Sequence, residues 1–288
     1  MENTISHYNT QLNASYSMEN KFRAWSGYRE NLRKICLQQG PWEGDIAIFG
    51  AGHLNDIDLQ SLPTESVRLT LFDCDAMAIK KGLALQGYQG EVIKRIGDLT
   101  GLDQARFFTS LTVLMAEKDV VGVERFLDEW VCQGPDLQSE GTFDLILISP
   151  LYTQLLWPQF LDLVVLMDLQ AYRSQLTEAM LRFLVRLIET LHRSILKTLK
   201  PEGRCMAWSD IMEYSTQDPR YLFLSHKKED LKKHVLDYEK QYGQGLGSYG
   251  LWHLETCLDK THPIEENWLI WPFDKDRHLI TKVIQGIR

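Results

Sequence analysis

The chain lacks the features that mark disulfide-rich proteins, zinc-binding proteins and strongly basic nucleic-acid-binding proteins. Its 288 residues include only five cysteines, which are widely spread and never paired as CxxC. This spacing indicates reduced thiols in a cytoplasm rather than a disulfide framework. Lys and Arg number 31 against 39 Asp and Glu, which gives a formal net charge of -8. Without a basic excess, broad binding to nucleic acid or to an anionic membrane is disfavoured.

Long apolar runs are also missing. The first residues, "MENTISHYNTQLNASYSMENKFRAW", contain no apolar segment flanked by basic residues, so no secretion signal is expected. The most apolar window, "FLDLVVLMDL", is interrupted by Asp162 and Asp168 and is too short to span a bilayer. We therefore expect a soluble, cytoplasmic protein without a membrane partner.

The chain does carry an alternation of strand-like and helix-like segments. Residues 18–39 form an amphipathic helical pattern that ends at Gly40-Pro41. Short apolar runs typical of strands follow: "DIAIFG", "VRLTLFDCD", "EVIKRIGD", "TFDLILIS" and "RCMAWSD". Helical stretches lie between them: "AMAIKKGLALQG", a region at 104–134 long enough for two helices, and "TEAMLRFLVRLIETLHRSILKTLK". This alternation predicts a parallel sheet covered by helices on both faces.

The end of the chain departs from that alternation. The runs "NWLIWPF" and "HLITKVIQGI" are separated only by residues 274–277, too few for a crossover helix, so they predict an antiparallel hairpin at a sheet edge. The expected fold class is α/β: a Rossmann-like, doubly wound, seven-stranded sheet, mostly parallel with a C-terminal antiparallel hairpin. We expect a helical N-terminal extension at 1–41, then one domain at 42–288 with insertions at about 103–138 and 211–262.

A glycine turn after the first strand marks the candidate site. Gly50-Ala51-Gly52 lets the backbone approach a ligand closely, and Asp73 ends the second strand with a carboxylate suited to the two hydroxyls of a ribose. In open α/β sheets, ligands bind at the carboxyl ends of the strands. A nicotinamide cofactor and an adenosyl cofactor would both use these two elements.

Further motifs distinguish the two cofactors. The third strand ends in Gly97-Asp98, where a carboxylate could accept a hydrogen bond from an adenine amino group. The segments "IAIFGAGHL", "LFDCD", "IGD", "FDLILISPLY" and "LKPEGRCMAW" follow the order and approximate spacing of the class I S-adenosylmethionine-dependent methyltransferases. The chain resembles this family over about residues 42–210 and the terminal hairpin. The resemblance implies an enzyme of class EC 2.1.1 that transfers a methyl group from S-adenosyl-L-methionine to an O or N atom of a small-molecule acceptor by in-line displacement.

The resemblance also implies roles for individual residues. Gly50 and Gly52 would line the methionine part of the cofactor, Asp73 would bind the ribose, Asp98 and Leu99 would bracket the adenine, and Ser149 would face the sulfonium. The complete set expected at the cofactor is Phe49, Gly50, Ala51, Gly52, Asn55, Asp73, Cys74, Asp98, Leu99, Ser149 and Pro150.

Two residues are candidates for catalysis. Tyr152 would orient a substrate amine or hydroxyl, although a half-buried structural tyrosine is an equal alternative. Asp210, expected at the end of the fifth strand, would accept a proton or hold a cationic substrate, against the alternative of a turn or cap carboxylate.

The glycine turn departs from the family pattern at two positions. Ile48 stands where the family usually has an acidic residue, and Leu54 stands where it has a third glycine. Asn55, Asp56 or Asp58 could supply the missing contact to the cofactor's amino group. The alternative is that Asn55 or Asp56 caps the next helix, as Asp75 is expected to cap the helix after the second strand.

The second insertion contains the glycine-rich stretch "YGQGLGSYGLWH", which suggests a lid or substrate wall, or else a mobile surface loop. Together with the N-terminal helix and the first insertion, it would enclose a small acceptor. His253, Cys257 and His262 have no paired-cysteine pattern beside them, so no metal site is expected. The segment 226–234 mixes charges as a solvated helix face does.

Two other functions stay open: an NAD(P)-dependent oxidoreductase, and a non-catalytic scaffold that keeps the fold. The sequence leaves the oligomeric state open between monomer and homodimer.

Overall fold

The computed structural model describes residues 18–38, 40, 42–63, 65–219, 221 and 228–288. The first part of the expected N-terminal extension and the beginning of the charged segment 226–234 therefore lie outside the described residues.

One seven-stranded sheet organises the chain, with the strand order β3-β2-β1-β4-β5-β7-β6. β1 to β5 run parallel to one another, and β7 pairs antiparallel with both β5 and β6. The strands are β1 (Gly44–Phe49), β2 (Val67–Asp73), β3 (Glu91–Ile96), β4 (Phe143–Ile148), β5 (Leu199–Ser215), β6 (Glu265–Trp271) and β7 (Arg277–Ile287). The predicted fold class and the terminal hairpin are confirmed.

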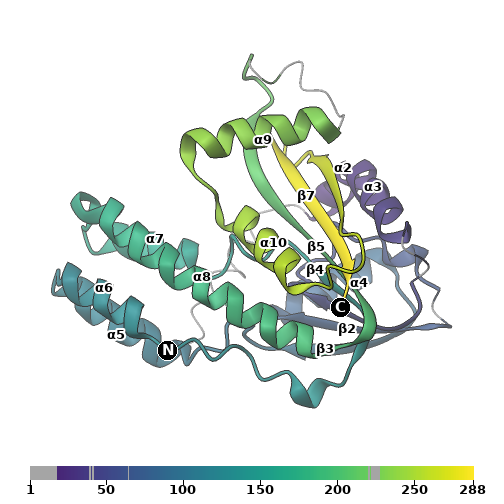
Figure 1. The fold of residues 1–288 in the computed structure, drawn as a ribbon, viewed down its shortest axis with the longest axis horizontal. Coiled ribbons are helices and arrows are strands. Elements are labelled where there is room, and N and C mark those ends of the chain that lie inside the picture. Colours follow the sequence, from purple (N-terminus) through teal and green to yellow (C-terminus); the bar gives the residue numbers. More distant parts are fainter. Residues whose placement is uncertain (1–17, 39, 41, 64, 220, 222–227) are drawn as a thin grey trace.

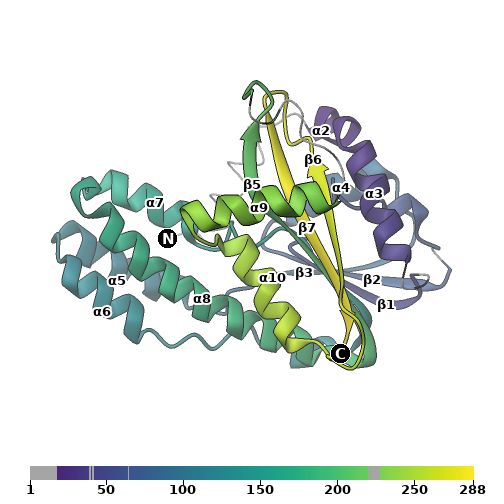
Figure 2. The ribbon, with the colours of Figure 1, turned by 45° about the horizontal axis from the view of Figure 1, so that its top comes forward.

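Helices cover both faces of the sheet (Figures 1 and 2). They are α2 (Met18–Ala24), α3 (Ser26–Leu37), α4 (Ala76–Gln86), α5 (Gln104–Ala116), α6 (Val120–Glu129), α7 (Trp157–Leu166), α8 (Arg173–Lys197), α9 (Lys228–Tyr242) and α10 (Leu246–Cys257). Short 3₁₀ turns occur at Leu59–Ser61, Gln138–Glu140 and Gln170–Tyr172. Among the described residues, no helix is both long and apolar enough to cross a membrane.

The strands alternate their buried side chains between two main cores, because successive residues point to opposite faces. Ala47 and Phe49 of β1 join the core beneath α5, α8 and α10, while Ile46 and Ile48 join the core beneath α3 and α4. A sheet buried on both sides explains the nearly continuous apolar strands of the sequence.

α5, α6, α7 and the first part of α8 form a helical layer that extends beyond the sheet (Figure 1). The region predicted as two helices forms α5 and α6, so that prediction is confirmed. The sequence did not predict α7. On the other side, α2 and α3 lie beside the C-terminal hairpin (Figure 2), with α3 packed on β6.

Two local expectations are wrong. The predicted N-terminal helix is broken at Trp25, which separates α2 from α3. β5 does not end near Asp210 but continues to Ser215, because its second half keeps pairing with β7 beyond the parallel part of the sheet.

Candidate functional site

A pocket of about 220 Å³ opens at the carboxyl ends of β1 to β4. Segments from these four strand ends, from α2 and from the hairpin between β6 and β7 surround it. The lining residues are Lys21, Trp25, Gly50, Ala51, Gly52, His53, Leu54, Asn55, Asp56, Asp73, Cys74, Gly97, Asp98, Leu99, Thr100, Ser149, Pro150, Leu151, Gln154, Leu155, Trp271 and Phe273. The set expected at a cofactor is thus brought together, except for Phe49.

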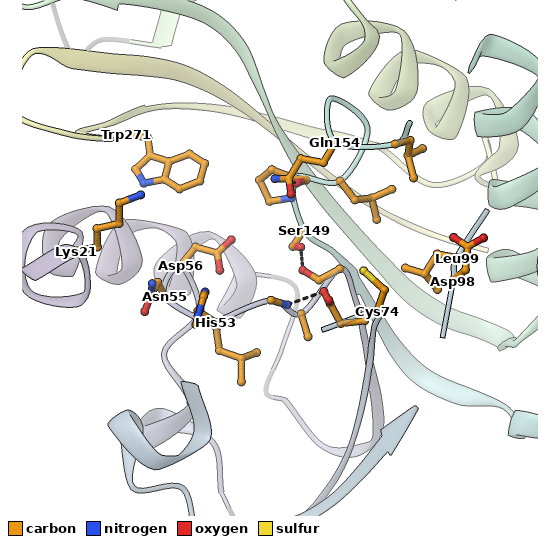
Figure 3. Close-up of a pocket in the computed structure, with 18 of the residues that line it drawn as sticks. Lys21, His53, Asn55, Asp56, Cys74, Asp98, Leu99, Ser149, Gln154 and Trp271 are labelled. Atoms are coloured by element: carbon orange, nitrogen blue, oxygen red, sulfur yellow. Dashed lines mark hydrogen bonds between the residues drawn. The ribbon is translucent and has the colours of Figure 1, made fainter. Parts of the chain in front are cut away.

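The floor of the pocket is the glycine turn. Gly50 and Gly52 have φ of +73° and +48°, a left-handed conformation that suits glycine. A Cβ on Gly50 would lie 2.8 Å from Ser149 Oγ, so no larger residue fits between the ends of β1 and β4. Ser149 Oγ donates a hydrogen bond to the Gly50 carbonyl, which ties these two strand ends together (Figure 3).

Asp73 joins the turn to the end of β2. The backbone N–H groups of Gly52 and Asp75 each donate a 2.8 Å hydrogen bond to one of its carboxylate oxygens. Burial raises the pKa of Asp73, and these two hydrogen bonds oppose the rise. The Cys74 side chain also makes a hydrogen bond to this carboxylate, and because a carboxylate can accept about four hydrogen bonds, one position stays open for a ligand hydroxyl.

In the described part of the connection between the turn and β2, a 3₁₀ turn at Leu59–Ser61 occurs and no α-helix does. The alternative that Asn55 or Asp56 caps a following helix is therefore wrong. Gln86 of α4, which is 1% exposed, replaces the missing helical hydrogen bonds. Its Oε1 accepts from Leu59 N at 2.8 Å, and its Nε2 donates to the carbonyls of Leu54 and Ile57 at 2.7 and 2.9 Å. The sequence offered no signal for this role, because a lone glutamine near a helix end looks like a surface residue.

Asp75 caps α4 as predicted, since its carboxylate accepts from the N–H groups of Met77 and Ala78.

Cys74, Asp98 and Leu99 lie at the opposite end of the pocket from Lys21 and Trp271 (Figure 3). The Asp98 carboxylate accepts from the backbone N–H of Thr100 at 2.9 Å and from the hydroxyl of the same residue. These bonds fix the direction of the Asp98 carboxylate at the rim of the pocket.

Asp56 lies at the Lys21 end and is 8% exposed. The indole N–H of Trp208 donates to its Oδ2 at 3.0 Å. Burial raises the pKa of Asp56 to about 6, and the hydrogen bond from Trp208 opposes that rise. Its neighbour Asn55 is 7% exposed and has a side-chain oxygen without a hydrogen-bond partner. Asp58, the third candidate, lies 4.0 Å from Arg33 on α3 rather than in the pocket lining.

An aromatic wall closes this end of the pocket. Trp25 packs edge-on against Trp271, with ring centroids 4.7 Å apart, and its indole N–H donates to the Phe273 carbonyl at 3.2 Å. The ammonium of Lys21 lies 4.5 Å from the Phe273 ring and 5.2 Å from the Trp25 ring. Burial lowers the pKa of Lys21 to about 8.

The sequence reading missed Lys21, Trp25, Trp271 and Phe273 as site residues. The signal for them was weak: Trp25 belongs to the amphipathic pattern of the N-terminal helix, and Trp271 and Phe273 flank Pro272 at the hairpin turn. The expectation that the N-terminal helix reaches the site holds. None of the lining residues comes from 103–138 or from the described part of 211–262, so the described residues of neither insertion enclose the pocket.

Three predicted site residues lie elsewhere. Phe49 is fully buried and stacks on Phe72 at 4.4 Å, because it is the last inward-facing residue of β1. Tyr152 is fully buried and its hydroxyl lies 2.9 Å from His192 Nε2, away from the pocket lining. Asp210 lies inside the extended β5, where the Thr153 hydroxyl donates to it at 3.4 Å. These placements do not fit contact of Tyr152 or Asp210 with a substrate in this pocket.

The glycine-rich segment expected to be a lid, wall or loop is helix α10, packed against β5 and α8. Its glycines permit close packing: a Cβ on Gly247 would lie 2.3 Å from the Asp210 carbonyl oxygen, and one on Gly250 would lie 2.7 Å from the Tyr152 ring. Within the described part of the chain, no group of three His, Cys, Asp or Glu side chains is arranged to hold a metal ion.

The topology identifies the fold. β1 to β5 keep the order 3-2-1-4-5 of doubly wound nucleotide-binding sheets, and the reversed β7 is inserted between β5 and β6. The fold is that of the class I S-adenosylmethionine-dependent methyltransferases. No family model matches the sequence, and no curated protein matches it.

Solved structures of methyltransferases resemble the chain. The N-methyltransferase NodS from Bradyrhizobium japonicum, in complex with S-adenosyl-L-homocysteine, is 13% identical, with 90% of this chain and 85% of that chain covered and a TM-score of 0.42. A putative O-methyltransferase from Nostoc punctiforme is 10% identical, with coverages of 94% and 60% and a TM-score of 0.45. A fibrillarin pre-rRNA processing protein from Methanococcus jannaschii is 11% identical, with coverages of 85% and 68% and a TM-score of 0.35.

Proposed function

We propose that the protein is an S-adenosyl-L-methionine-dependent methyltransferase and that the pocket at the ends of β1 to β4 binds this cofactor. The observation that carries the proposal is that Gly50, Gly52, Asp73, Asp98 and Ser149, each at a strand end, line one cavity. When bound, the cofactor would supply an electrophilic methyl group on a sulfonium.

The chemistry of the lining fits the two halves of such a molecule. Toward one end, the acceptor position that stays open on Asp73 suits a ribose hydroxyl. Asp98 offers a carboxylate beside the less polar Leu99 and Cys74, which suits the amino group and the flat faces of an adenine. At the other end, the unpartnered oxygen of Asn55 is a buried acceptor that lacks a donor. A buried acceptor without a donor favours a ligand with N–H groups there.

Asp56 and Lys21 together suit an amino acid. An α-amino acid carries an ammonium and a carboxylate, and this end of the pocket offers a carboxylate and an ammonium. Burial disfavours the charged form of each group, so the pKa of Asp56 is raised to about 6 and that of Lys21 is lowered to about 8. A zwitterionic ligand would reverse both effects. We infer that Asp56 replaces the acidic residue that Ile48 does not provide, and that Lys21 binds the carboxylate of the methionine part.

The residues around the reacting atoms would align the reactants and exclude water, and they would not exchange protons. Displacement at a methyl carbon needs the nucleophile, carbon and sulfur in line in a dry site. Ser149, Pro150 and Leu151 would form one side of that site, and the Trp25–Trp271 pair would exclude water from the other. The acceptor would be a small molecule that enters beside Gln154.

Calorimetry with S-adenosyl-L-homocysteine and, separately, with NAD tests the cofactor. Binding of the first in the micromolar range, with no binding of the second, supports the proposal. Binding of NAD would point to an oxidoreductase, and binding of neither to a scaffold protein; both results contradict the proposal. A labelled-methyl assay on small-molecule, RNA and protein fractions of a cell extract would then identify the acceptor class, and label in the RNA or protein fraction alone would exclude the small-molecule acceptor.

A further inference from the structure

A buried chain of three rings connects the rim of the pocket to α10. The Tyr152 hydroxyl lies 2.9 Å from His192 Nε2, and His192 Nδ1 lies 2.9 Å from His253 Nδ1. Tyr152 and His192 are 0% exposed, whereas His253 is half-buried. Residues on both sides of Tyr152, namely Pro150, Leu151, Gln154 and Leu155, line the pocket.

Hydrogen-bond satisfaction fixes the direction of this chain at neutral pH. Burial lowers the pKa of His192 to about 3, so this ring stays neutral and carries a single N–H. If that hydrogen is on Nδ1, it donates to His253 Nδ1, and Nε2 is left to accept from the Tyr152 hydroxyl. Both nitrogens of His192 and the Tyr152 hydroxyl are then satisfied. With the hydrogen on Nε2, the buried Tyr152 hydroxyl would face an N–H and its own hydrogen would lose its acceptor, which is costly in the core.

We propose that Tyr152 and His192 are positioning residues for the pocket segment 149–155, and that protonation of His253 reverses their hydrogen bonds. A proton taken up by His253 goes to Nδ1, its ring nitrogen facing His192. Two N–H groups cannot face each other across 2.9 Å, so the hydrogen of His192 must be carried on Nε2 instead. The net change is one proton gained by His253, while His192 keeps one N–H and Tyr152 keeps its hydroxyl hydrogen. Tyr152 then loses its acceptor, and the segment 149–155 loses the hydrogen bond that helps to position it.

The surroundings place this change on the acidic side of neutrality. Burial lowers the pKa of His253, Glu189 on α8 raises it and Arg193 on α8 lowers it further. The other titratable groups that face the rings are Tyr249 and Cys257 on α10 and Cys205 on β5. Tyr249 donates to Glu189 at 2.7 Å, so the carboxylate that raises the pKa of His253 is itself held in place.

The packing leaves Tyr152 little alternative position. Gly250 of α10 lies against the Tyr152 ring so closely that a Cβ there would be 2.7 Å from it. The ring of Tyr152 is therefore clamped between α8 and α10, and only its hydrogen bond can change without unfolding the core. The ligand that this pocket segment would serve is known only from the proposed function. The hydrogen-bond reversal itself does not depend on that function.

The direct test is ¹⁵N NMR of the histidine rings of the whole protein between pH 8 and pH 5, without any ligand. We expect His192 to carry its hydrogen on Nδ1 at pH 8 and on Nε2 at pH 5, with the backbone amide signals of Leu151 and Gln154 shifting in parallel with the titration of His253. An unchanged His192 tautomer, or amide signals that ignore His253, would overturn the inference. Because no ligand is present, this outcome is independent of whether the protein is a methyltransferase.

Variants test the inference a second time through the same amide signals. His253→Gln should remain folded, because the residue is half-buried, and should abolish the acid-induced shifts of Leu151 and Gln154. Tyr152→Phe should shift the same amides already at pH 8. The matched control is Tyr214→Phe. It removes another tyrosine hydroxyl that faces a histidine: the hydroxyl of Tyr214 on β5 lies 3.3 Å from Nδ1 of His278 on β7. This control should leave the Leu151 and Gln154 signals as in the wild type; if it shifts them as much as Tyr152→Phe does, the positioning role is refuted.

Discussion

The indole N–H of Trp208 donates a 3.0 Å hydrogen bond to Oδ2 of Asp56, so the most buried carboxylate of the pocket is held from the sheet side. Trp208 belongs to β5 and is fully buried, which makes this arrangement rigid. Burial raises the pKa of Asp56 to about 6, because the hydrogen bonds from Trp208 and from its own backbone N–H, together with the charge of Arg29, do not fully replace the water that a carboxylate loses.

Asp56→Asn should therefore stabilise the empty protein and weaken cofactor binding at the same time. A carboxyl group whose pKa rises on folding destabilises the folded state progressively as pH rises from its unfolded pKa to its folded pKa, so the contribution of Asp56 to stability should fall between pH 3.8 and about 6. A rise from 3.8 to about 6 corresponds to on the order of 3 kcal/mol. Asn keeps an oxygen for Trp208 but carries no charge, so urea unfolding at pH 8 should give a higher free energy of unfolding for the variant.

The same variant should bind S-adenosyl-L-homocysteine at least tenfold more weakly, since the contact of a carboxylate with an ammonium is lost. Asp58→Asn is the control, because Asp58 lies beside Arg33 outside the pocket lining. A variant that is more stable yet binds less ligand cannot be explained by misfolding. Equal affinity of wild type and Asp56→Asn would show that Asp56 does not bind the ligand's ammonium.

A second prediction concerns Asp73. In Asp73→Asn, one side-chain oxygen becomes an NH₂ group that faces the N–H of Gly52 or of Asp75, so one hydrogen bond becomes a repulsive contact. Calorimetry should show S-adenosyl-L-homocysteine affinity reduced by about 10- to 100-fold, since a hydrogen bond to a charged group is worth about 1.5–3 kcal/mol.

Asp75→Asn, two residues further on, is the matched control for that experiment. Asn is as good a helix cap as Asp, and its oxygen can accept from Met77 and Ala78 as before. The affinity of Asp75→Asn should stay within about threefold of the wild type. If both variants lose affinity equally, the effect belongs to the β2–α4 turn as a whole and not to the ligand contact of Asp73.

The sequence was sufficient for the centre of the sheet, because β1, β2 and β4 are largely apolar runs that end beside Gly50, Asp73 and Ser149. Ile46 to Phe49 and Leu145 to Ile148 illustrate this, since every position is buried on one face or the other. The cofactor side of the site was predictable for the same reason: the parallel strands bring Gly50, Asp73, Asp98 and Ser149 to one edge whatever the helices do.

The other side of the site was not predictable, because it depends on packing between segments far apart in the chain. Trp25 and Trp271 are 246 positions apart, and their contact requires α3 to lie along β6. Tyr152 was misplaced for a related reason: a position two residues after Pro150 can point to the pocket or to the core, and only the approach of Gly250 and His192 decides between them.

Lys21 provides a third prediction, on pH dependence. Its ammonium is the charged form, so the attraction for a ligand carboxylate should be present below pH 8 and be lost as pH rises through the pKa of about 8. Calorimetry between pH 7 and pH 9.5 should show wild-type affinity for S-adenosyl-L-homocysteine falling with rising pH. Lys21→Met, which keeps most of the apolar stem, should bind more weakly at pH 7 and show a flatter profile. Lys34→Met, an exposed lysine on α3, is the control and should keep the wild-type profile; a wild-type profile in Lys21→Met would contradict the role of Lys21.

The last prediction concerns Gln86, which supports the glycine turn from behind. Gln86→Ala removes three hydrogen bonds to the backbone of Leu54, Ile57 and Leu59 and leaves these backbone groups buried without partners. An unsatisfied buried group costs about 1–3 kcal/mol, and water can enter the space of the lost side chain, so we expect a total loss of about 2–4 kcal/mol in the free energy of unfolding.

Gln60→Ala is the control for Gln86→Ala, because the exposed Gln60 only donates to the Gln86 carbonyl at 2.7 Å. It should cost less than about 1 kcal/mol in urea unfolding. Gln86→Ala should also weaken binding of S-adenosyl-L-homocysteine although it contacts no ligand, because residues 52–56 are held in place by the bonds that it loses. A variant that loses stability but keeps full affinity would mean that the turn is held by Asp73 and Ser149 alone.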